Sequence, residues 1–322
     1  MTIDVENGRR WTDMDLAGSA DLADVILIRR NDGTGVKRLA LSSLQELIAG
    51  DLTLLETEHK DDLVAAINDN AEGVADAAEK ITMLETMLGG SGAGFHNSIY
   101  RGKSLGNALT EEQHAAIVSG TFDDMYIGDY WTIGGVVYRI ADFDYFLRSG
   151  DTECTAHHVV VVPDTALYNE KMNDSNTTAG GYTGSKMYTT NLATAKTTIK
   201  NAFGTSHILT HREYHCNAVT NGKPSGGAWF DSDIELMSEA MVYGGSFFEP
   251  TSDGSTVPAK YSVACKQLNL FRFRPDMISN RTTYWLRNVV SATDFAYVDA
   301  NGLASLNGAS VSLGVRPAFC LI

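Results

Sequence analysis

Histidines and cysteines occur in two short clusters that could bind a transition metal. Cys154 lies three residues before a His-His pair, and His211 lies four residues before His215, which Cys216 follows. The second spacing would place two ligands on one face of a helix, where zinc could be held. The surrounding sequence SHILTHREYHC instead alternates as a strand does, which separates consecutive ligands. We therefore expect no metal and no other cofactor.

Carboxylates suggest a second chemistry, the hydrolysis of a glycosidic bond. Asp142, Asp144 and Glu153 could meet in space, and such a reaction uses a pair of carboxylates. A depolymerase usually needs a longer, groove-forming fold, however. The chain also has no G-x-S-x-G, phosphate-binding loop or G-x-G-x-x-G motif. We expect a protein that is not an enzyme, with an envelope polysaccharide hydrolase kept as one alternative.

Charge and composition exclude several partners. The chain has 40 acidic and 25 basic residues and a formal net charge of −15. A nucleic-acid partner is therefore not expected, because phosphate binding needs a cationic face. No run of about 18 apolar residues is present, so we expect no membrane insertion. The first residues have no apolar stretch behind Arg9 and Arg10, so we expect no signal peptide.

The four cysteines are Cys154, Cys216, Cys265 and Cys320, and none forms a C-x-x-C pair. We expect buried thiols, in keeping with the absence of a signal peptide, with a disulfide as the alternative.

Residues 288–314 interleave two kinds of side chain. The frame is apolar or glycine: Val289, Val290, Phe295, Val298, Gly302, Ala304, Ala309 and Gly314. Between its members stand residues of changing chemistry: Asp294, Tyr297, Asp299, Ala300, Asn301, Leu303, Ser305, Leu306, Asn307, Ser310 and Ser312. The frame can hold a hairpin from which the interleaved residues point outward together on one face. Tyr, Ser and Asn favour adaptable binding, so we predict a ligand-binding surface; a polar hairpin without a partner is the alternative.

The residues that flank this segment are expected to be structural. Trp285, Leu286, Pro317 and Phe319 should fill the core or frame it, and Arg287 and Arg316 should pair with buried carboxylates or carbonyl groups.

A heptad pattern lies in the first third of the chain. Its members are spaced alternately by four and three residues: Leu63, Ile67, Asn70, Val74, Ala77, Ile81, Leu84 and Leu88. Such a seam winds helices around one another, and the polar Asn70 would fix their register. We predict that this seam drives homo-oligomerisation, together with the flanking domains because the helix is short. Packing of the seam against the chain's own domain is the alternative.

Other elements surround these segments. Strands are expected at 24–29 and 36–41 around a turn at 31–35, with a helix starting at Ser42 and Ser43. Glycines at 89–94 form a flexible joint. Farther on, strands are expected at 126–133, 136–140 and 157–163, and helices at 111–120, 192–203 and, more weakly, 231–241. The pattern predicts an α+β fold.

Two segments resemble known families. The strand–turn–strand–helix of the first 50 residues resembles the adaptor modules at the N-termini of phage fibre proteins, although a generic hairpin and helix would look the same. The segments YWLRN (284–288) and GVRPAF (314–319), with IYRGKSLG, IGDYW, VVVVPD, MYTTNL and ELMSE upstream, resemble a domain of unknown function from gut bacteria and their phages. That family is similar to C-type lectins, and in related proteins diversity-generating retroelements rewrite this C-terminal stretch.

The resemblance also has limits. Many sugar-binding C-type lectins hold calcium with Glu-Pro-Asn or Gln-Pro-Asp, whereas here Thr251 follows Glu249-Pro250 and no Trp-Asn-Asp occurs. Calcium-dependent sugar binding is therefore not expected. Formylglycine-generating enzymes share the lectin-like fold, but no close cysteine pair matches theirs.

Together these observations predict a phage receptor-binding protein, a tail fibre or adhesin located in the virion. Residues 1–50 would attach it to other tail or virion proteins, 51–90 would form a coiled-coil stalk, and 95–322 would form a C-type-lectin-like domain that binds a host-surface protein or glycan. Phage fibres suggest a trimer. A structural tail or capsid-decoration protein is the remaining alternative.

Overall fold

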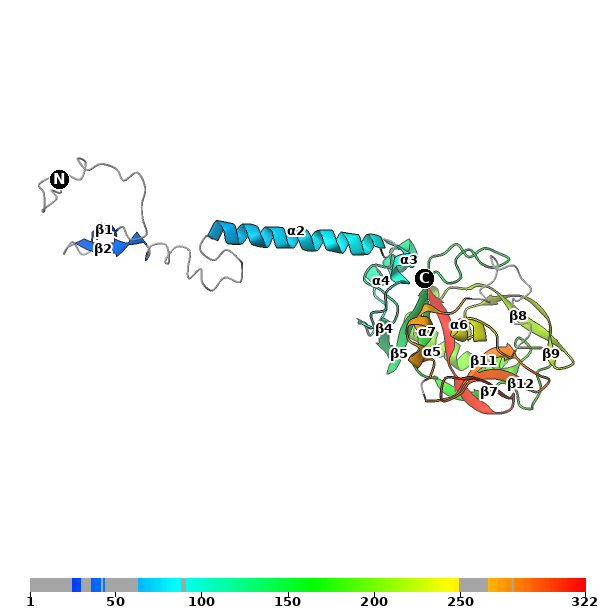
Figure 1. The fold of residues 1–322 in the computed structure, drawn as a ribbon. Coiled ribbons are helices and arrows are strands. Elements are labelled where there is room, and N and C mark those ends of the chain that lie inside the picture. Colours follow the sequence, from blue (N-terminus) through cyan, green and yellow to red (C-terminus); the bar gives the residue numbers. More distant parts are fainter. Residues whose placement is uncertain are drawn as a thin grey trace, which may run out of the picture. The chain divides into compact units, whose positions relative to one another are not determined.

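The computed structural model describes residues 25–29, 36–41, 43, 63–87, 91–248, 266–279 and 281–322. The chain divides into two compact units, residues 1–84 and 85–322, and each is considered by itself. Helices and strands are both abundant (Figure 1), so the predicted α+β class is confirmed. None of the helices in the described ranges has the length and apolar character needed to cross a membrane.

The first unit contains the predicted hairpin. β1 (Val25–Arg29) and β2 (Val36–Ala40) pair antiparallel, from Val25 opposite Ala40 to Arg29 opposite Val36. Both strands agree with the sequence prediction to within one residue at each end. The turn at 31–35 and most of the helix expected after Ser42 lie outside the described residues.

The heptad segment is one helix, α2 (Leu63–Met87). Its seam is open to solvent in the single chain: Ile67, Val74, Ile81 and Leu84 are between 56% and 71% exposed. Asn70 and Ala77 are exposed as well. Of the remaining seam residues, the side chain of Leu63 and the whole of Leu88 lie outside the described part of the chain.

The second unit contains a six-stranded sheet. In spatial order its strands are β10 (Ile234–Leu236), β15 (Pro317–Leu321), β6 (Val159–Pro163), β5 (Val136–Phe143), β4 (Tyr130–Ile133) and β3 (Ser104–Gly106). Every residue of β6 and β15 is buried, which explains their unbroken apolar sequences. The predicted hairpin is confirmed, since Ile133 pairs with Val136 around Gly134 and Gly135. Both glycines have positive φ, 59° and 82°, as a type I′ turn requires.

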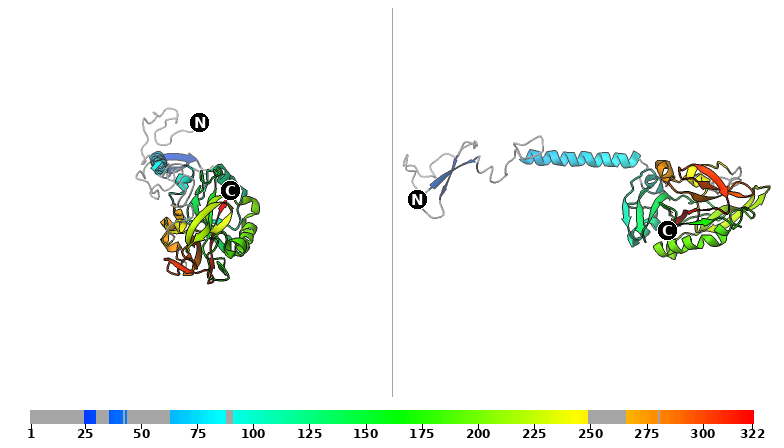
Figure 2. Two further views of the ribbon diagram at one scale, coloured as in Figure 1. Left: turned by 90° about the vertical axis from the view of Figure 1, so that its right-hand side faces the viewer. Right: turned by 90° about the horizontal axis from the view of Figure 1, so that it is seen from below.

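A five-stranded sheet completes the C-terminal half of this unit. Its order is β13 (Ala304–Gly308), β12 (Asp294–Val298), β11 (Tyr284–Val289), β14 (Ser312–Val315) and β7 (Tyr168–Lys171). β13 is therefore an edge strand. Only Arg316 separates β14 from β15, so the chain passes from one sheet to the other at this residue; β15 is the red C-terminal strand of Figures 1 and 2.

Short helices and a ribbon surround the sheets. They are α3 (Ala93–His96), α4 (Glu111–Ser119), the π-helical turn η3 (Met187–Asn191), α5 (Ala193–Phe203), the 3₁₀ turns η4 (Thr205–His207) and η5 (Pro275–Met277), α6 (Glu239–Tyr243), α7 (Asn269–Phe273), and the ribbon of β8 (His211–Thr220) and β9 (Lys223–Ser232). The helices expected at 111–120 and 192–203 are confirmed.

The helix expected at 231–241 is mostly wrong. Ile234 to Leu236 form β10, which pairs with β15, and the helix begins only at Glu239 after the N-cap Ser238. Apolar residues two apart could serve a strand as well as a helix, and the partner strand decided the outcome.

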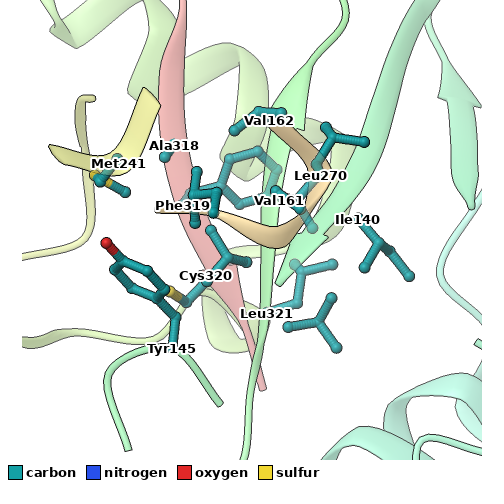
Figure 3. Packing of buried hydrophobic residues seen from close by; sticks show 14 of the residues in the cluster. Ile140, Tyr145, Val161, Val162, Met241, Leu270, Ala318, Phe319, Cys320 and Leu321 are labelled. Atoms are coloured by element: carbon teal, nitrogen blue, oxygen red, sulfur yellow. The ribbon is translucent and has the colours of Figure 1, made fainter. Parts of the chain in front are cut away.

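The core of the second unit has two apolar clusters. One lies around β15 and β6 and includes Val161, Phe319 and Leu321 (Figure 3). The other lies under the five-stranded sheet and includes Trp285, Phe295 and Val315. Cys154, Cys216 and Cys320 are buried and form no disulfide, which confirms the thiol prediction for these three, and Cys265 lies outside the described residues.

Candidate functional site

The predicted binding segment is built on β11, a strand whose six residues are all buried. Trp285 of β11 is opposite Tyr297 of β12, and the centres of the two rings are 6.2 Å apart at 73°. The indole N–H of Trp285 donates to the carbonyl oxygen of Glu170 at 2.9 Å, so its one polar atom is satisfied. The ring contact and the hydrogen bond together hold the indole in place, so Tyr297 packs against a buried side chain with a fixed orientation.

None of the eleven residues predicted to bind a ligand is buried. They lie on β12, on the turn at 299–303, on β13, on the loop at 309–311 and on Ser312, the first residue of β14. Leu303 and Leu306 are 64% and 43% exposed, which is unusual for leucine side chains. We call residues 299–312, which comprise the turn, β13, the loop and Ser312, the hairpin edge.

The prediction that these residues share one outward face is wrong. Tyr297 is opposite Ser305 and Phe295 is opposite Asn307, so Tyr297, Ser305 and Asn307 share one face. Asp294 and Leu306 lie on the other face, Leu306 being opposite the buried Ala296. Both faces of β12 are covered by the core, since Phe295 and Ala296 are each fully buried. The exposed residues consequently gather along the edge of the sheet rather than on one of its faces.

Asp299 and Asp294 have structural hydrogen bonds. Asp299 Oδ1 accepts from the backbone N–H groups of Asn301 and Leu303, both at 2.8 Å, and so shapes the turn. Asp294 Oδ2 accepts from the hydroxyl groups of Ser291 and Thr293. These contacts make Asp294 and Asp299 part of the frame rather than exchangeable positions.

Ser310 is hydrogen-bonded to Asn176, a residue that the sequence analysis did not place near the binding segment. Its backbone N–H and its hydroxyl both donate to Asn176 Oδ1, at 3.0 and 2.6 Å. A side chain at Gly308 would collide with the same Asn176, whose Oδ1 would be 2.6 Å from a Cβ there. The loop around 176 therefore lies against the hairpin edge. Only the pairing of distant segments places it there, and no local pattern could have identified it.

The two frame arginines behave as predicted. Arg316, 1% exposed, donates from Nε to the carbonyl oxygen of Pro163 at 2.8 Å and from Nη1 to that of Met277 at 3.1 Å. Its guanidinium also lies 5.0 Å from the ring centre of Tyr284. Arg316 thus ties together the two sheets that the chain connects at this residue.

Arg287 forms a buried ion pair. Its Nη2 lies 2.7 Å from Glu213 Oε2, and His211 Nε2 lies 3.2 Å from Glu213 Oε1. Arg287 and Glu213 are only 4% and 6% exposed. Burial opposes ionisation of the glutamate, but Arg287 and His211 outweigh it and hold the pKa of Glu213 well below its usual range. The carboxylate is therefore charged at neutral pH.

The three carboxylates considered for hydrolysis do not share a site. Asp142 and Asp144 line a cleft of about 500 Å³, whereas Glu153 lines a different cleft of about 440 Å³. Asp144 accepts from the backbone N–H of His158 at 3.0 Å and lies 2.7 Å from His157 Nδ1. Burial raises the pKa of Asp142 to about 7, and the N–H of Asn269 and the charge of Lys266 oppose the rise.

His158, in the first histidine cluster, has hydrogen bonds at both ring nitrogens. His158 accepts from the backbone N–H of Phe146 at Nε2 and bonds the carbonyl oxygen of Ala156 at Nδ1, which leaves it no lone pair for a metal. Within the described ranges, no three histidine, cysteine or acidic side chains are arranged to hold a metal ion.

Comparison with known proteins adds one finding. Residues 232–322 match a family described as "Domain of unknown function (DUF6273)". The match starts just before β10 and covers α6, β11 to β15 and the whole hairpin edge. Neither a curated protein nor a solved structure matches the chain.

Proposed function

We propose that this protein is a non-enzymatic phage receptor-binding protein, a tail fibre or adhesin, whose hairpin edge binds a host-surface protein or glycan. The observation that carries the proposal is the separation of roles at the C-terminus. β11 and β15 are wholly buried, whereas the residues between them that vary in chemistry are all accessible. A rigid support with accessible side chains allows specificity to change without loss of the fold.

The proposal includes a C-type-lectin-like fold for residues 95–322 and rewriting of the hairpin edge by a retroelement. The wholly buried YWLRN strand and the buried Arg316 of GVRPAF support a structural role for the two segments that carry the resemblance. The first 50 residues would attach the protein to other virion proteins, and the hairpin β1–β2 supports the likeness to fibre adaptors.

A direct test uses the full chain and living host cells. Replacing Asn301, Leu303 and Leu306 together with alanine should reduce binding to host cells at least tenfold, because these exposed side chains would contact the ligand. Labelled protein and flow cytometry would measure the loss. The proposal fails if the triple variant binds host cells as well as the parent does.

A matched control is available on α4. Val118 is 55% exposed and lies outside the hairpin edge, so Val118→Ala should leave cell binding unchanged. Thermal unfolding of all variants would show whether folding is intact. A structural tail protein would show no saturable binding with either variant or the parent.

We further propose that α2 associates into a parallel coiled coil, as a trimer by analogy with phage fibres. The exposed surface of the seam supports this: Ile67, Val74, Ile81 and Leu84 are each more than 50% exposed in the single chain. A seam of large apolar side chains is stable in water only when another helix covers it. Several linked copies would raise the avidity for a repeated surface ligand by roughly 10²–10⁴ for each linked pair.

Disruption of the seam should therefore dissociate the protein. In Ile81→Lys each chain would place a charge in the same layer of the seam, and we expect the full chain to become monomeric at micromolar concentration. Met83→Lys is the matched control, since Met83 is 62% exposed and lies off the seam. Size-exclusion chromatography with light scattering measures the mass. An unchanged mass for Ile81→Lys would contradict the proposed coiled coil.

A further inference from the structure

The ribbon of β8 and β9 is a two-stranded sheet joined to no third strand among the described elements (Figure 1). One of its faces is turned to the core: Glu213 and His215 are buried and are opposite Phe230 and Ala228. The other face carries two successive cross-strand pairs, Arg212 with Asp231 and Tyr214 with Trp229. None of these four residues is buried.

The two aromatic rings pack edge to face. The ring centres of Tyr214 and Trp229 are 5.5 Å apart at 78°, and both side chains are half-buried. Tyr214 lies directly over Gly227, because a Cβ at that glycine would be 2.4 Å from the tyrosine ring. A glycine beneath an aromatic ring lets the ring lie flat on the ribbon. The ring is thus positioned by the backbone and needs little ordering when a ligand arrives.

The neighbouring charged pair is also pre-arranged. Arg212 donates from Nε and Nη2 to the two oxygens of Asp151, at 2.8 and 3.1 Å, and from Nη1 to Asp231 at 3.0 Å. Arg212 and Asp231 line the cleft of about 440 Å³, together with Thr152, Glu153 and Thr210. The cleft therefore combines the carboxylates of Glu153 and Asp231 with hydroxyl groups, and its Arg212–Asp231 pair is next to the aromatic pair along the ribbon.

We propose that this outer face of the ribbon and its cleft form a second binding site, which takes a neutral saccharide. Aromatic rings accommodate the apolar C–H face of a pyranose, and planar carboxylate groups accept from vicinal hydroxyls. The volume is in the range of small-ligand pockets, which combine apolar walls with a few fixed polar groups. Arg212 is already paired with Asp151 and Asp231, and Glu153 also lines the cleft, so an anionic sugar would be repelled.

This site is independent of the hairpin edge, and it does not rest on the proposed function. Isothermal titration of the full chain with maltotriose, mannotriose and N,N′-diacetylchitobiose tests it, with 3′-sialyllactose as the anionic comparison. We expect at least one neutral sugar to bind with a Kd of about 0.1–1 mM, and sialyllactose to bind at least tenfold more weakly.

Tryptophan fluorescence gives a second readout. Trp131 and Trp285 are fully buried, whereas Trp229 is partly open, so among the described tryptophans the sugar should change the emission of Trp229. Trp229→Ala should weaken binding at least tenfold, Trp229→Phe should retain part of it, and Asp231→Asn should weaken it without disturbing the ribbon. Val118→Ala should bind as the parent does.

Three outcomes would overturn the site. The first is that no neutral sugar binds saturably up to ~10 mM. The second is that Trp229→Ala and Asp231→Asn both bind the sugar with the affinity of the parent. The third is that the protein binds sialyllactose more tightly than the neutral sugars. The hairpin-edge triple variant separates the two proposals. If it loses cell binding but retains sugar binding, both sites stand; if it loses both, the sugar was bound at the hairpin edge and the ribbon site is wrong.

Discussion

Replacing Arg287 with methionine should destabilise the second unit by about 3–5 kcal/mol. Glu213 and Arg287 are almost inaccessible, and the nearest pair of their charged atoms lies 2.7 Å apart. Methionine fills a similar volume but leaves the Glu213 carboxylate buried without its main counter-charge. The cost of that buried charge exceeds anything lost in packing. Urea denaturation followed by circular dichroism would measure the change.

A double variant separates the charge from the packing. Glu213→Leu combined with Arg287→Met removes both charges at once, so most of the lost stability should return. The reason is that a buried ion pair contributes little beyond what a well-packed apolar pair contributes. A cost below about 1 kcal/mol for Arg287→Met alone would show that water reaches the pair.

The same pair predicts a dependence on pH. The pKa of Glu213 is lower in the folded chain than its ordinary value of 4.5, so folding favours the ionised form. Its stabilising contribution is therefore complete above pH 4.5 and decreases as the pH falls below that value. The double variant should lack this part of the acid sensitivity, and the difference between the two denaturation profiles isolates it.

The sequence identified which residues belong to the frame but not their partners. An arginine in an apolar strand must pair with a carboxylate or carbonyl, and this was predictable from its chemistry alone. That Arg287 pairs with Glu213, and Arg316 with the carbonyl oxygens of Pro163 and Met277, depends on which strands become neighbours. Strand order is set by contacts between distant segments, which no local pattern encodes.

Local signals predicted the elements better than their faces. The paired glycines at 134–135 act within a few residues, so the β4–β5 hairpin was predicted correctly. The structure shows that α4 also begins at a local signal, the capping box of Thr110 and Gln113. The single outward face failed for a different reason. The alternation rule assumes that one side of a strand meets water, whereas the centre of β12 is covered on both sides and most accessible residues lie on the edge strand β13 and the segments that flank it.

Replacing Trp285 with alanine should cost about 3–5 kcal/mol. The indole is fully buried, packs against Tyr297 and donates to the carbonyl oxygen of Glu170, so its loss leaves a large cavity and an unpaired acceptor beneath the hairpin edge. Trp285→Phe keeps most of the volume but not the hydrogen bond, and should cost roughly half as much. Circular dichroism during urea denaturation measures both variants without relying on tryptophan emission.

The comparison that matters is with the exposed triple replacement of Asn301, Leu303 and Leu306, which should cost less than about 0.5 kcal/mol at each position. A chain that tolerates change at the hairpin edge must concentrate its stability in the residues beneath it. If the triple variant is as unstable as Trp285→Ala, the hairpin edge is part of the folding core and could not vary freely. If only Trp285→Ala unfolds readily, the support and the accessible side chains are energetically separate, as a site that changes its specificity requires.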